Sequence, residues 1–506
     1  MGGNNSKKEL NKDLKQLGEE ANKKNPDTLE DGNFLIYLNN LISISSSSPP
    51  EKDYNIIKFI SKGRFTEINL VQNKISENKG VMKTIHRTEK FSEKTEKLLE
   101  NEVKILTSLD HPNIINVFNI YSNEKSYSYI TEFCKEGDLY QELLQNGAYD
   151  EKTTAYIMYQ ILSAVNYYHN HNIINRSLSL DNILISEKKN NLPTIKISYF
   201  VRSIKAEKDV IQNQKMAFSY YSAPELINQC YNEKCDLWSC GVIMYFLLSA
   251  RPPFGGENNE EINSRILSGK YDLLNPPFNN VSKECIDLLK QLLEVRVYKR
   301  IDAAKALNHP WFKKFNSKLL FHQINDESIL TKLIENLKSY KNKSILQKIS
   351  MAYLIHSFPQ MKDVINAAKL FNKIDSDDDC RINKEELYNG LKLKYNTVVK
   401  KEDVEQIFTN IDINNNGYID YEEFVSAAVN KRKFMNKSTL MLAFKYFDKN
   451  DSGEISFDEI EKMFKESVID KTKVHDSLQN IMKEVDLNVD GKITFEEFSI
   501  IMKNLI

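Results

Sequence analysis

The sequence predicts an α+β domain, made of a strand-rich lobe and a helical lobe, followed by an all-α domain built from a repeated unit. Its 506 residues suggest about three units, at roughly 150 residues per domain. Short β-like runs at residues 54–60 and 67–72 precede helical patterns at residues 94–109, 153–170 and 237–248. After residue 311 the spacing of apolar residues is helical throughout, and the last part of the chain repeats itself.

The composition is that of an ordinary globular protein. Lys plus Arg (69) nearly balances Asp plus Glu (70), so no global charge favours nucleic acid as a partner. The apolar stretch Phe34–Ile42 is far shorter than the roughly 20 residues of a spanning helix, and we expect no secretory signal. The six cysteines form no C-x-x-C pair, which predicts reduced thiols and a cytoplasmic location.

Residues 1–50 are polar, rich in lysine and end in Ser45–Pro50, which predicts a disordered extension. Met1–Ser6 fits the N-myristoylation pattern M-G-x-x-x-S/T. A single acyl chain binds membranes only marginally, and the first 24 residues carry six lysines against four acidic residues. We therefore expect reversible membrane contact, with the protein peripheral at a cytosolic membrane face; the alternative is a plain disordered tail.

The repeat in residues 363–506 has the spacing of a metal-binding loop. Four segments begin at Asp375, Asp412, Asp448 and Asp486, so their starts lie 37, 36 and 38 residues apart. In each, oxygen-bearing side chains fall at positions 1, 3, 5, 9 and 12, the pattern of a twelve-residue calcium loop whose position 7 offers a backbone carbonyl. The predicted Ca²⁺ ligands are Asp375, Asp377, Asp379, Arg381, Asn383 and Glu386; Asp412, Asn414, Asn416, Tyr418, Asp420 and Glu423; Asp448, Asn450, Ser452, Glu454, Ser456 and Glu459; and Asp486, Asn488, Asp490, Lys492, Thr494 and Glu497.

Position 6 of such a loop turns sharply and favours glycine. Gly417, Gly453 and Gly491 comply, whereas Cys380 should cost roughly 1 kcal/mol relative to glycine. We still expect the first loop to bind calcium, with altered affinity. Surface loops can imitate one such motif by chance, but four in phase are strong support for calcium binding. The β-branched residues at position 8 can pair between loops: Ile382, Ile419, Ile455 and Ile493. These segments resemble the paired EF-hands of calmodulin-like sensor domains.

Residues 51–312 resemble the protein-kinase signature set. The matching strings appear in the expected order: Val81–Lys83, Glu102, Ala223–Glu225, Asp236–Gly241 and Arg300. The resemblance implies a bilobal protein-kinase fold, followed by an all-α calmodulin-like domain with two EF-hand pairs. A kinase region at 51–312, a helical junction at 313–362 and EF-hands at 363–506 form the layout of the calcium-dependent protein kinases of plants and protists, which this chain resembles.

Several positions that perform chemistry in that family differ here. Ser177 replaces the aspartate that accepts the substrate proton, and Tyr199 replaces the aspartate that holds magnesium. Gly63 is the one glycine retained in the glycine-rich loop, Val81 narrows the adenine pocket, and Phe218 replaces a threonine of the substrate platform. These changes predict little or no kinase activity.

Other positions keep their family identity. Lys83, Glu102 and Asn182 remain, so we weigh two outcomes equally: weak ATP binding with reduced or absent magnesium dependence, and no ATP binding. Asp181 is the neighbouring acid that could replace the missing base, although the side chain at this position of the family normally points away from the substrate.

The junction between the two domains has no glycine and a single proline, Pro359, and can form a continuous helix. Ile329, Leu333 and Leu337 share one face, and further apolar residues follow: Ile345, Ile349 and Met351. The lysines make a basic surface, as in calmodulin targets: Lys338, Lys341, Lys343 and Lys348. The resemblance implies that this junction is an intramolecular partner of the EF-hands, captured when calcium binds. The alternative is a helix that caps the kinase lobe.

The sequence as a whole predicts a calcium-responsive pseudokinase that regulates contacts with an unidentified protein partner. Two alternatives stay open. One is a calcium-activated Ser/Thr kinase with atypical catalytic residues, and the other is a calcium buffer with an inert kinase fold.

Overall fold

The computed structural model describes most of the chain after residue 47, and the statements below concern these residues: 48–63, 66–87, 93–206, 210–214, 220–274, 276–315, 327–340, 345–377, 379–392, 401–412, 416–461, 485–486, 488 and 490–505. The expectations for Met1–Ser6, Phe218, Asn414, Lys341 and Lys343 lie outside the described residues. Within them, no helix is long and apolar enough to cross a membrane.

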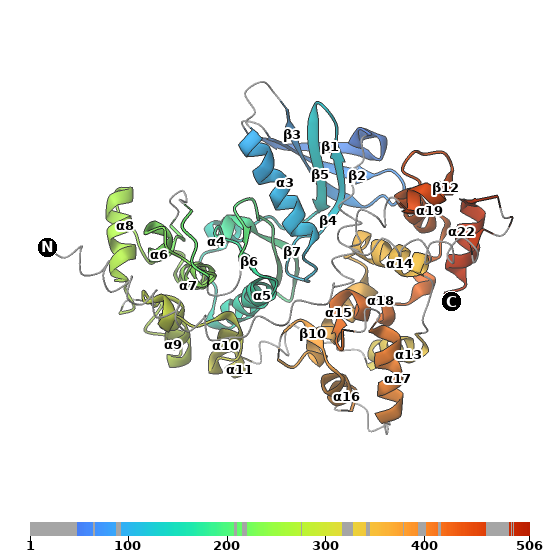
Figure 1. Ribbon diagram of the computed structural model, residues 1–506. Helices are drawn as coiled ribbons and strands as arrows, with labels where there is room; N and C mark the ends of the chain where they lie inside the picture. The colour runs from blue at the N-terminus through green and yellow to red at the C-terminus, as the bar shows by residue number, and fades with distance from the viewer. Residues whose placement is uncertain are drawn as a thin grey trace.

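The first lobe is a five-stranded antiparallel sheet in the order β1-β2-β3-β5-β4, preceded by the 3-10 turn η1 (Pro50–Lys52). Figure 1 shows the single helix α3 (Glu93–Thr107) beside this sheet. Burial alternates along much of β2 and β3, whereas β1 is exposed after Tyr54, and the five strands confirm the expected strand-rich lobe. They are β1 (Tyr54–Lys62), β2 (Thr66–Asn73), β3 (Lys79–His86), β4 (Val117–Ser122) and β5 (Ser126–Glu132).

The second lobe is mainly helical and is organised around α5 and α7, which are buried along most of their lengths. A local signal explains the start of α5, because the Asp150 carboxylate accepts a hydrogen bond from the Thr153 N–H. The helices are α4 (Leu139–Asn146), α5 (Glu151–Asn170), α6 (Pro224–Ile227), α7 (Lys234–Ser249), α8 (Asn259–Ser268), α9 (Lys283–Leu292), α10 (Ala303–Leu307) and α11 (Pro310–Lys314), with the 3-10 turns η2 (Leu180–Asn182) and η3 (Val297–Lys299). Two short antiparallel strand pairs complete it: β7 (Ile183–Lys189) with β8 (Leu192–Ile197), and β6 (Ile173–Ile174) with β9 (Ile204–Lys205).

The C-terminal domain consists of helices joined by short paired strands. The loop strands pair as the sequence predicted, with Ile382 opposite Ile419 and Ile455 opposite Ile493. The described elements are α15 (Lys362–Ile374), β10 (Arg381–Ile382), α16 (Lys384–Lys392), α17 (Lys401–Ile411), β11 (Ile419–Asp420), α18 (Tyr421–Ala428), η4 (Lys431–Phe434), α19 (Lys437–Phe447), β12 (Glu454–Ser456), β13 (Lys492–Thr494) and α22 (Phe495–Lys503).

The junction is not one continuous helix, and this expectation is wrong. It forms α13 (Glu327–Ser339) and α14 (Ile345–Ser357), and Tyr340 has already left the helix. A tertiary contact explains the end of α13, because the Tyr340 carbonyl accepts a hydrogen bond of 3.1 Å from the Asn410 side chain of α17. The buried faces of α13 and α14 join the hydrophobic core of the EF-hand domain.

The EF-hand domain and α14 lie against the kinase-like domain (Figure 1). His356 of α14 lies 2.7 Å from the Val117 carbonyl through its Nε2, and Asn78 donates a hydrogen bond of 3.0 Å to the Ser357 carbonyl. Lys52 forms an ion pair with Asp451 of the third loop. Val117 begins β4, at the sheet edge opposite to β1, whereas Lys52 precedes β1 and Asn78 precedes β3, so the contacts are not confined to one edge of the sheet.

Candidate calcium loops and nucleotide cleft

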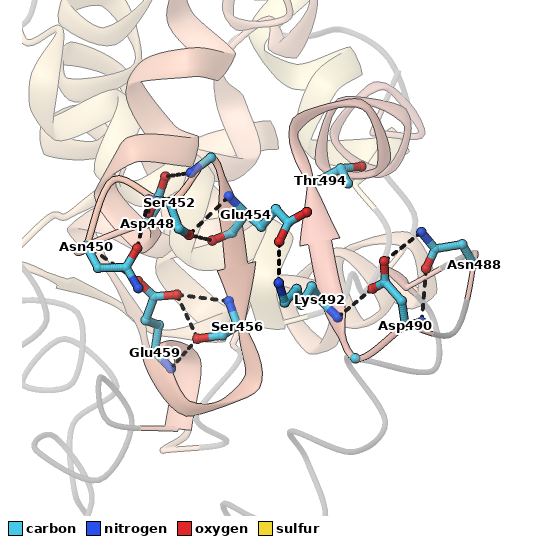
Figure 2. A network of polar contacts seen from close by, with 12 residues as sticks. Asp448, Asn450, Ser452, Glu454, Ser456, Glu459, Asn488, Asp490, Lys492 and Thr494 are labelled. Atoms are coloured by element: carbon cyan, nitrogen blue, oxygen red, sulfur yellow. Dashed lines mark hydrogen bonds and ion pairs between the residues drawn. The ribbon is translucent and has the colours of Figure 1, made fainter.

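The third and fourth loops show how the repeat positions its oxygens (Figure 2). In the third loop, the Asp448 carboxylate accepts hydrogen bonds of 2.9 Å from the N–H groups of Ser452 and Gly453. The Glu459 carboxylate, at position 12, accepts one of 2.9 Å from the Ser456 N–H. These bonds wrap the backbone around the first and last carboxylates of the loop and aim both at its interior.

The other loops repeat this arrangement. The first carboxylate of each accepts a hydrogen bond from the backbone N–H of position 6, and the last carboxylate accepts one from position 9. The distances to position 6 are 2.9 Å for Asp375 and Cys380, 3.1 Å for Asp412 and Gly417, and 2.8 Å for Asp486 and Gly491. The same geometry at each loop is what a common ligand would require.

The first loop brings its carboxylates closest together. Oxygens of Asp375, Asp377 and Glu386 all lie within 4.8 Å of one another. Burial and the neighbouring charge of Asp377 raise the pKa of Asp379 to about 6. Crowded carboxylates of this kind repel one another without a cation, and hard oxygen ligands suit Ca²⁺. The donor set therefore fits calcium.

Cys380 occupies the turn position of the first loop in the left-handed conformation, with φ of 65°. Its side chain is buried and belongs to the hydrophobic core of the kinase-like domain. The sequence identified the departure from glycine but held no signal for this contact. The thiol gains packing against another domain, which offsets part of the cost of the backbone conformation.

Position 7 contributes backbone carbonyls, so its side chains point elsewhere. Figure 2 shows Glu454 and Lys492, at this position of the third and fourth loops, paired with one another at 2.6 Å. Both side chains are exposed, so the pair adds little to stability. It links the two loops beside the β12–β13 pairing.

Replacing Glu386 with Gln tests whether the first loop binds calcium despite Cys380. The change removes the charge of the bidentate ligand, so isothermal titration of the whole chain should find one fewer Ca²⁺ per molecule. Glu385→Gln is the matched control, since Glu385 is adjacent and exposed and should leave the stoichiometry unchanged. An unchanged stoichiometry in Glu386→Gln would show that this loop is empty in the native protein.

In the kinase-like domain, Glu102 of α3 lies at the centre of a buried network. Its carboxylate lies 3.0 Å from Lys83 Nζ and accepts hydrogen bonds of 2.7 Å from the Tyr129 hydroxyl and 3.2 Å from the Phe200 N–H. The resemblance to protein kinases implies the pairing of Lys83 with Glu102 but not the contact with Tyr129, which depends on the position of β5 beside β3. The network holds α3 against β3 with or without nucleotide.

Tyr199 lies next to this network. Its ring is 5.8 Å from Lys83 Nζ, which also lies 5.4 Å from the Tyr129 ring. Burial and the Glu102 charge raise the pKa of Tyr199, so its phenol stays neutral. Asn182 donates a hydrogen bond of 3.0 Å to the Ser177 carbonyl. With one neutral phenol and one carboxamide, these residues do not fit the usual pair of magnesium ions.

The loop that carries Ser177 keeps its scaffold. Asp236 accepts hydrogen bonds from the N–H groups of Asn175 (2.9 Å) and Arg176 (2.8 Å), and lies 3.0 Å from His169. The Ser177 hydroxyl faces Asn175 Oδ1 at 3.3 Å, and no carboxylate among the described residues contacts it. Asp181, in η2, is exposed. The fold therefore places the Ser177 hydroxyl at the position where phosphate transfer would need a base.

Gly63 closes the turn after β1, where its N–H donates a hydrogen bond of 2.7 Å to the Thr66 carbonyl. A Cβ at this position would lie 2.7 Å from the Thr66 hydroxyl, so a larger residue would require that side chain to move.

Comparisons with known proteins cover both domains. The protein kinase domain family matches residues 54–312, and the EF-hand domain pair family matches residues 366–429 and 437–503. The chain is 33% identical over 459 residues to Calcium-dependent protein kinase 4 of Plasmodium berghei. The aligned region covers 88% of this chain and 85% of that protein. It is 29% identical over 454 residues to Calcium-dependent protein kinase 21 of Arabidopsis thaliana, covering 90% of this chain and 83% of the relative.

Proposed function

Since the chain belongs to the calcium-dependent protein kinase family, we propose that it is a calcium-responsive pseudokinase whose kinase fold regulates protein contacts rather than transferring phosphate. The EF-hand pairs imply calcium binding. The observation that carries the proposal is the neutral Tyr199 ring beside Lys83, at the position from which magnesium is held in active members.

A second change supports the same proposal. Ser177 replaces the base, and a serine hydroxyl does not accept a proton at neutral pH without a partner. The contacts that keep the fold in shape are retained: the Lys83–Glu102 pair and the Asp236 scaffold. A kinase fold that has lost its catalytic residues but keeps the contacts that hold its shape is suited to binding other proteins.

Calcium would act through the docked EF-hand domain. Its first loop packs on the kinase core through Cys380, and its third loop pairs with Lys52 through Asp451. A change in either loop on calcium binding therefore moves a group that touches the kinase-like domain. The junction helices, packed in the EF-hand core, would move with it.

A calcium-activated Ser/Thr kinase is the second candidate. The names of the relatives favour it, since each is a calcium-dependent protein kinase. Asp181 is the acid available to act as its base. A third candidate, a calcium buffer, predicts no change of shape on calcium binding.

Small-angle scattering with calcium and with a chelator tests the proposed response. We expect the radius of gyration to differ measurably between the two states, because the loops that bind calcium are also interdomain contacts. A variant with Gln in place of the four position-12 glutamates is the control and should show a single state: Glu386, Glu423, Glu459 and Glu497. Identical curves for the native protein in both conditions would favour the buffer.

We also propose that a myristoyl group at Gly2 gives reversible membrane contact at a cytosolic surface. Co-expression with an N-myristoyltransferase, followed by sedimentation with anionic vesicles, tests this. The native chain should partition partly with the vesicles and Gly2→Ala should stay in the supernatant. Equal partitioning of both would contradict the proposal.

A further inference from the structure

Strand β1 exposes large apolar side chains on a strand with a free edge. Of its nine residues, Tyr54 is buried and the others are exposed. Four of the exposed side chains are large and apolar, with 46% to 54% of their surface accessible: Ile56, Ile57, Phe59 and Ile60. β1 ends the sheet and, among the described strands, pairs with β2 alone. Grouped apolar side chains on an exposed edge strand mark a contact surface.

The contacts described above leave this surface uncovered. The EF-hand domain reaches the entry to β1 at Lys52 and the start of β4 at Val117, yet β1 stays exposed after Tyr54 in the docked protein. Ile56 lies seven residues before Gly63, which is roughly 20 Å along an extended strand. A nucleotide held under the Gly63 turn would therefore reach only the far end of β1.

A second copy of this chain does not suit the surface. Antiparallel pairing of β1 with itself about its middle residue would place Lys58 beside the same residue of the other copy, and like charges opposite one another are destabilising. The register of β1 on β2 also shifts between Ile56 and Lys58 and between Phe59 and Ser61. Bulges of this kind disturb edge-to-edge pairing. The surface is better matched by an uncharged segment that packs on the side chains.

The chain itself contains such a segment shortly before β1. Residues 34–44 lie outside the described residues, but the sequence gives their chemistry: eight of the eleven are apolar and none is charged. Residues 1–33, by contrast, carry six lysines and seven acidic residues. Residues 45–53 alone separate the segment from β1, and a tether this short gives an effective concentration in about the millimolar range. We propose that residues 34–44 pack on the exposed apolar side chains of β1.

Charges flanking the segment agree with this docking. Lys58 and Lys62 of β1 are exposed, Lys62 by 66% although it lies 3.8 Å from Glu67. Glu30 and Asp31 precede the segment, so an antiparallel course that turns within residues 45–53 would bring them toward the Lys62 end of β1. Exposed charges of this kind set orientation more than affinity. The docking does not depend on whether the kinase fold is active or the N-terminus is acylated.

Limited proteolysis of the full chain tests the docking from the side of β1. Chymotrypsin cuts after aromatic residues and leucine, and docking should protect the sites in the segment: Phe34, Leu35, Tyr37, Leu38 and Leu41. Ile56→Ser with Phe59→Ser should speed their cleavage about tenfold or more, because proteolysis follows the population of the undocked segment. Leu144→Ser, at a residue of α4 that is 62% exposed, is the matched control and should leave the rate unchanged. Equal cleavage rates in the native chain and in the folded double variant would overturn the proposal.

Hydroxyl-radical footprinting of the full chain tests the docking from the side of the segment. Docking should protect Phe59 from labelling, with the exposed Tyr298 as internal reference. Leu35→Asp, Leu38→Asp and Leu41→Asp together should abolish that protection. The same change at three leucines elsewhere in the extension should preserve it: Leu10, Leu14 and Leu17. Equal labelling of Phe59 in the native chain and in both variants would refute the docking. Protection that survives the change at residues 35, 38 and 41, or that falls on dilution, would assign the surface to a second copy instead.

Discussion

Calcium-loaded protein incubated with labelled ATP, magnesium and a generic peptide is expected to transfer phosphate at about 10⁻² per second or more slowly. An ordinary kinase turns over at about 1 to 100 per second, and loss of a positioned general base costs roughly 10² to 10⁴. In the proposed pseudokinase, Ser177 stands in place of the base and Tyr199 in place of one magnesium ligand, so the two losses would compound. The measurement is radiolabel incorporation under saturating ATP.

Returning an aspartate to position 199 or to position 177 separates the loss of the magnesium ligand from the loss of the base. Tyr199→Asp should produce a magnesium-dependent thermal shift with ATP that the native chain lacks, because it supplies the missing anion beside Lys83. Ser177→Asp alone should leave transfer low, since the metal defect remains. Asp181→Asn is the matched control and should change nothing. Phosphate incorporation that Ser177→Asp does not increase but Asp181→Asn abolishes would contradict the pseudokinase proposal and favour the active kinase.

Replacing Arg300 with Met is expected to destabilise the kinase-like domain by about 3–5 kcal/mol, because Glu225 would keep a buried charge without a partner. Both side chains are fully buried, and Arg300 Nη2 donates a hydrogen bond of 3.0 Å to Glu225 Oε2. The guanidinium also lies 5.1 Å from the Trp238 ring. Both tryptophans of the chain, Trp238 and Trp311, lie in this domain, so urea unfolding followed by tryptophan fluorescence reports on it selectively.

Arg296→Met is the matched control for that experiment. Arg296 pairs with Glu294 at 3.0 Å, but its side chain is 52% exposed, so its loss should cost at most about 1 kcal/mol. Similar destabilisation by both variants would show that the Arg300–Glu225 pair has no special role. Calcium titration of Arg300→Met should be unchanged, because the loops lie in the other domain.

Patterns within short stretches of sequence predicted most of the fold and the calcium loops. The β-like run at residues 67–72 became β2, and the helical spacing at 153–170 became α5, because side-chain periodicity reflects local geometry. The pairing of Ile382 with Ile419 also followed from spacing within the repeat. Asp375 and Glu386 converge for the same reason, since twelve consecutive residues contain the whole ligand set.

Contacts between distant residues lay beyond such patterns. The sequence of the junction predicted a continuous helix, yet α13 ends where the Asn410 side chain donates a hydrogen bond to the Tyr340 carbonyl. Tyr129 joins the Lys83–Glu102 pair only because β5 lies beside β3 in the sheet. Cys380 looked like a defect in the first loop, and its burial against the kinase core emerges only when the two domains are docked.

The sequence by itself determined the two-domain layout, the four calcium loops and the loss of the catalytic carboxylates, because each depends on which residue occupies a position in a local motif. Only the tertiary structure decided how the domains meet, where the junction breaks and that Cys380 is buried against the core of the kinase-like domain. The physical reason is that packing brings together side chains hundreds of residues apart, and their burial arises only from that packing.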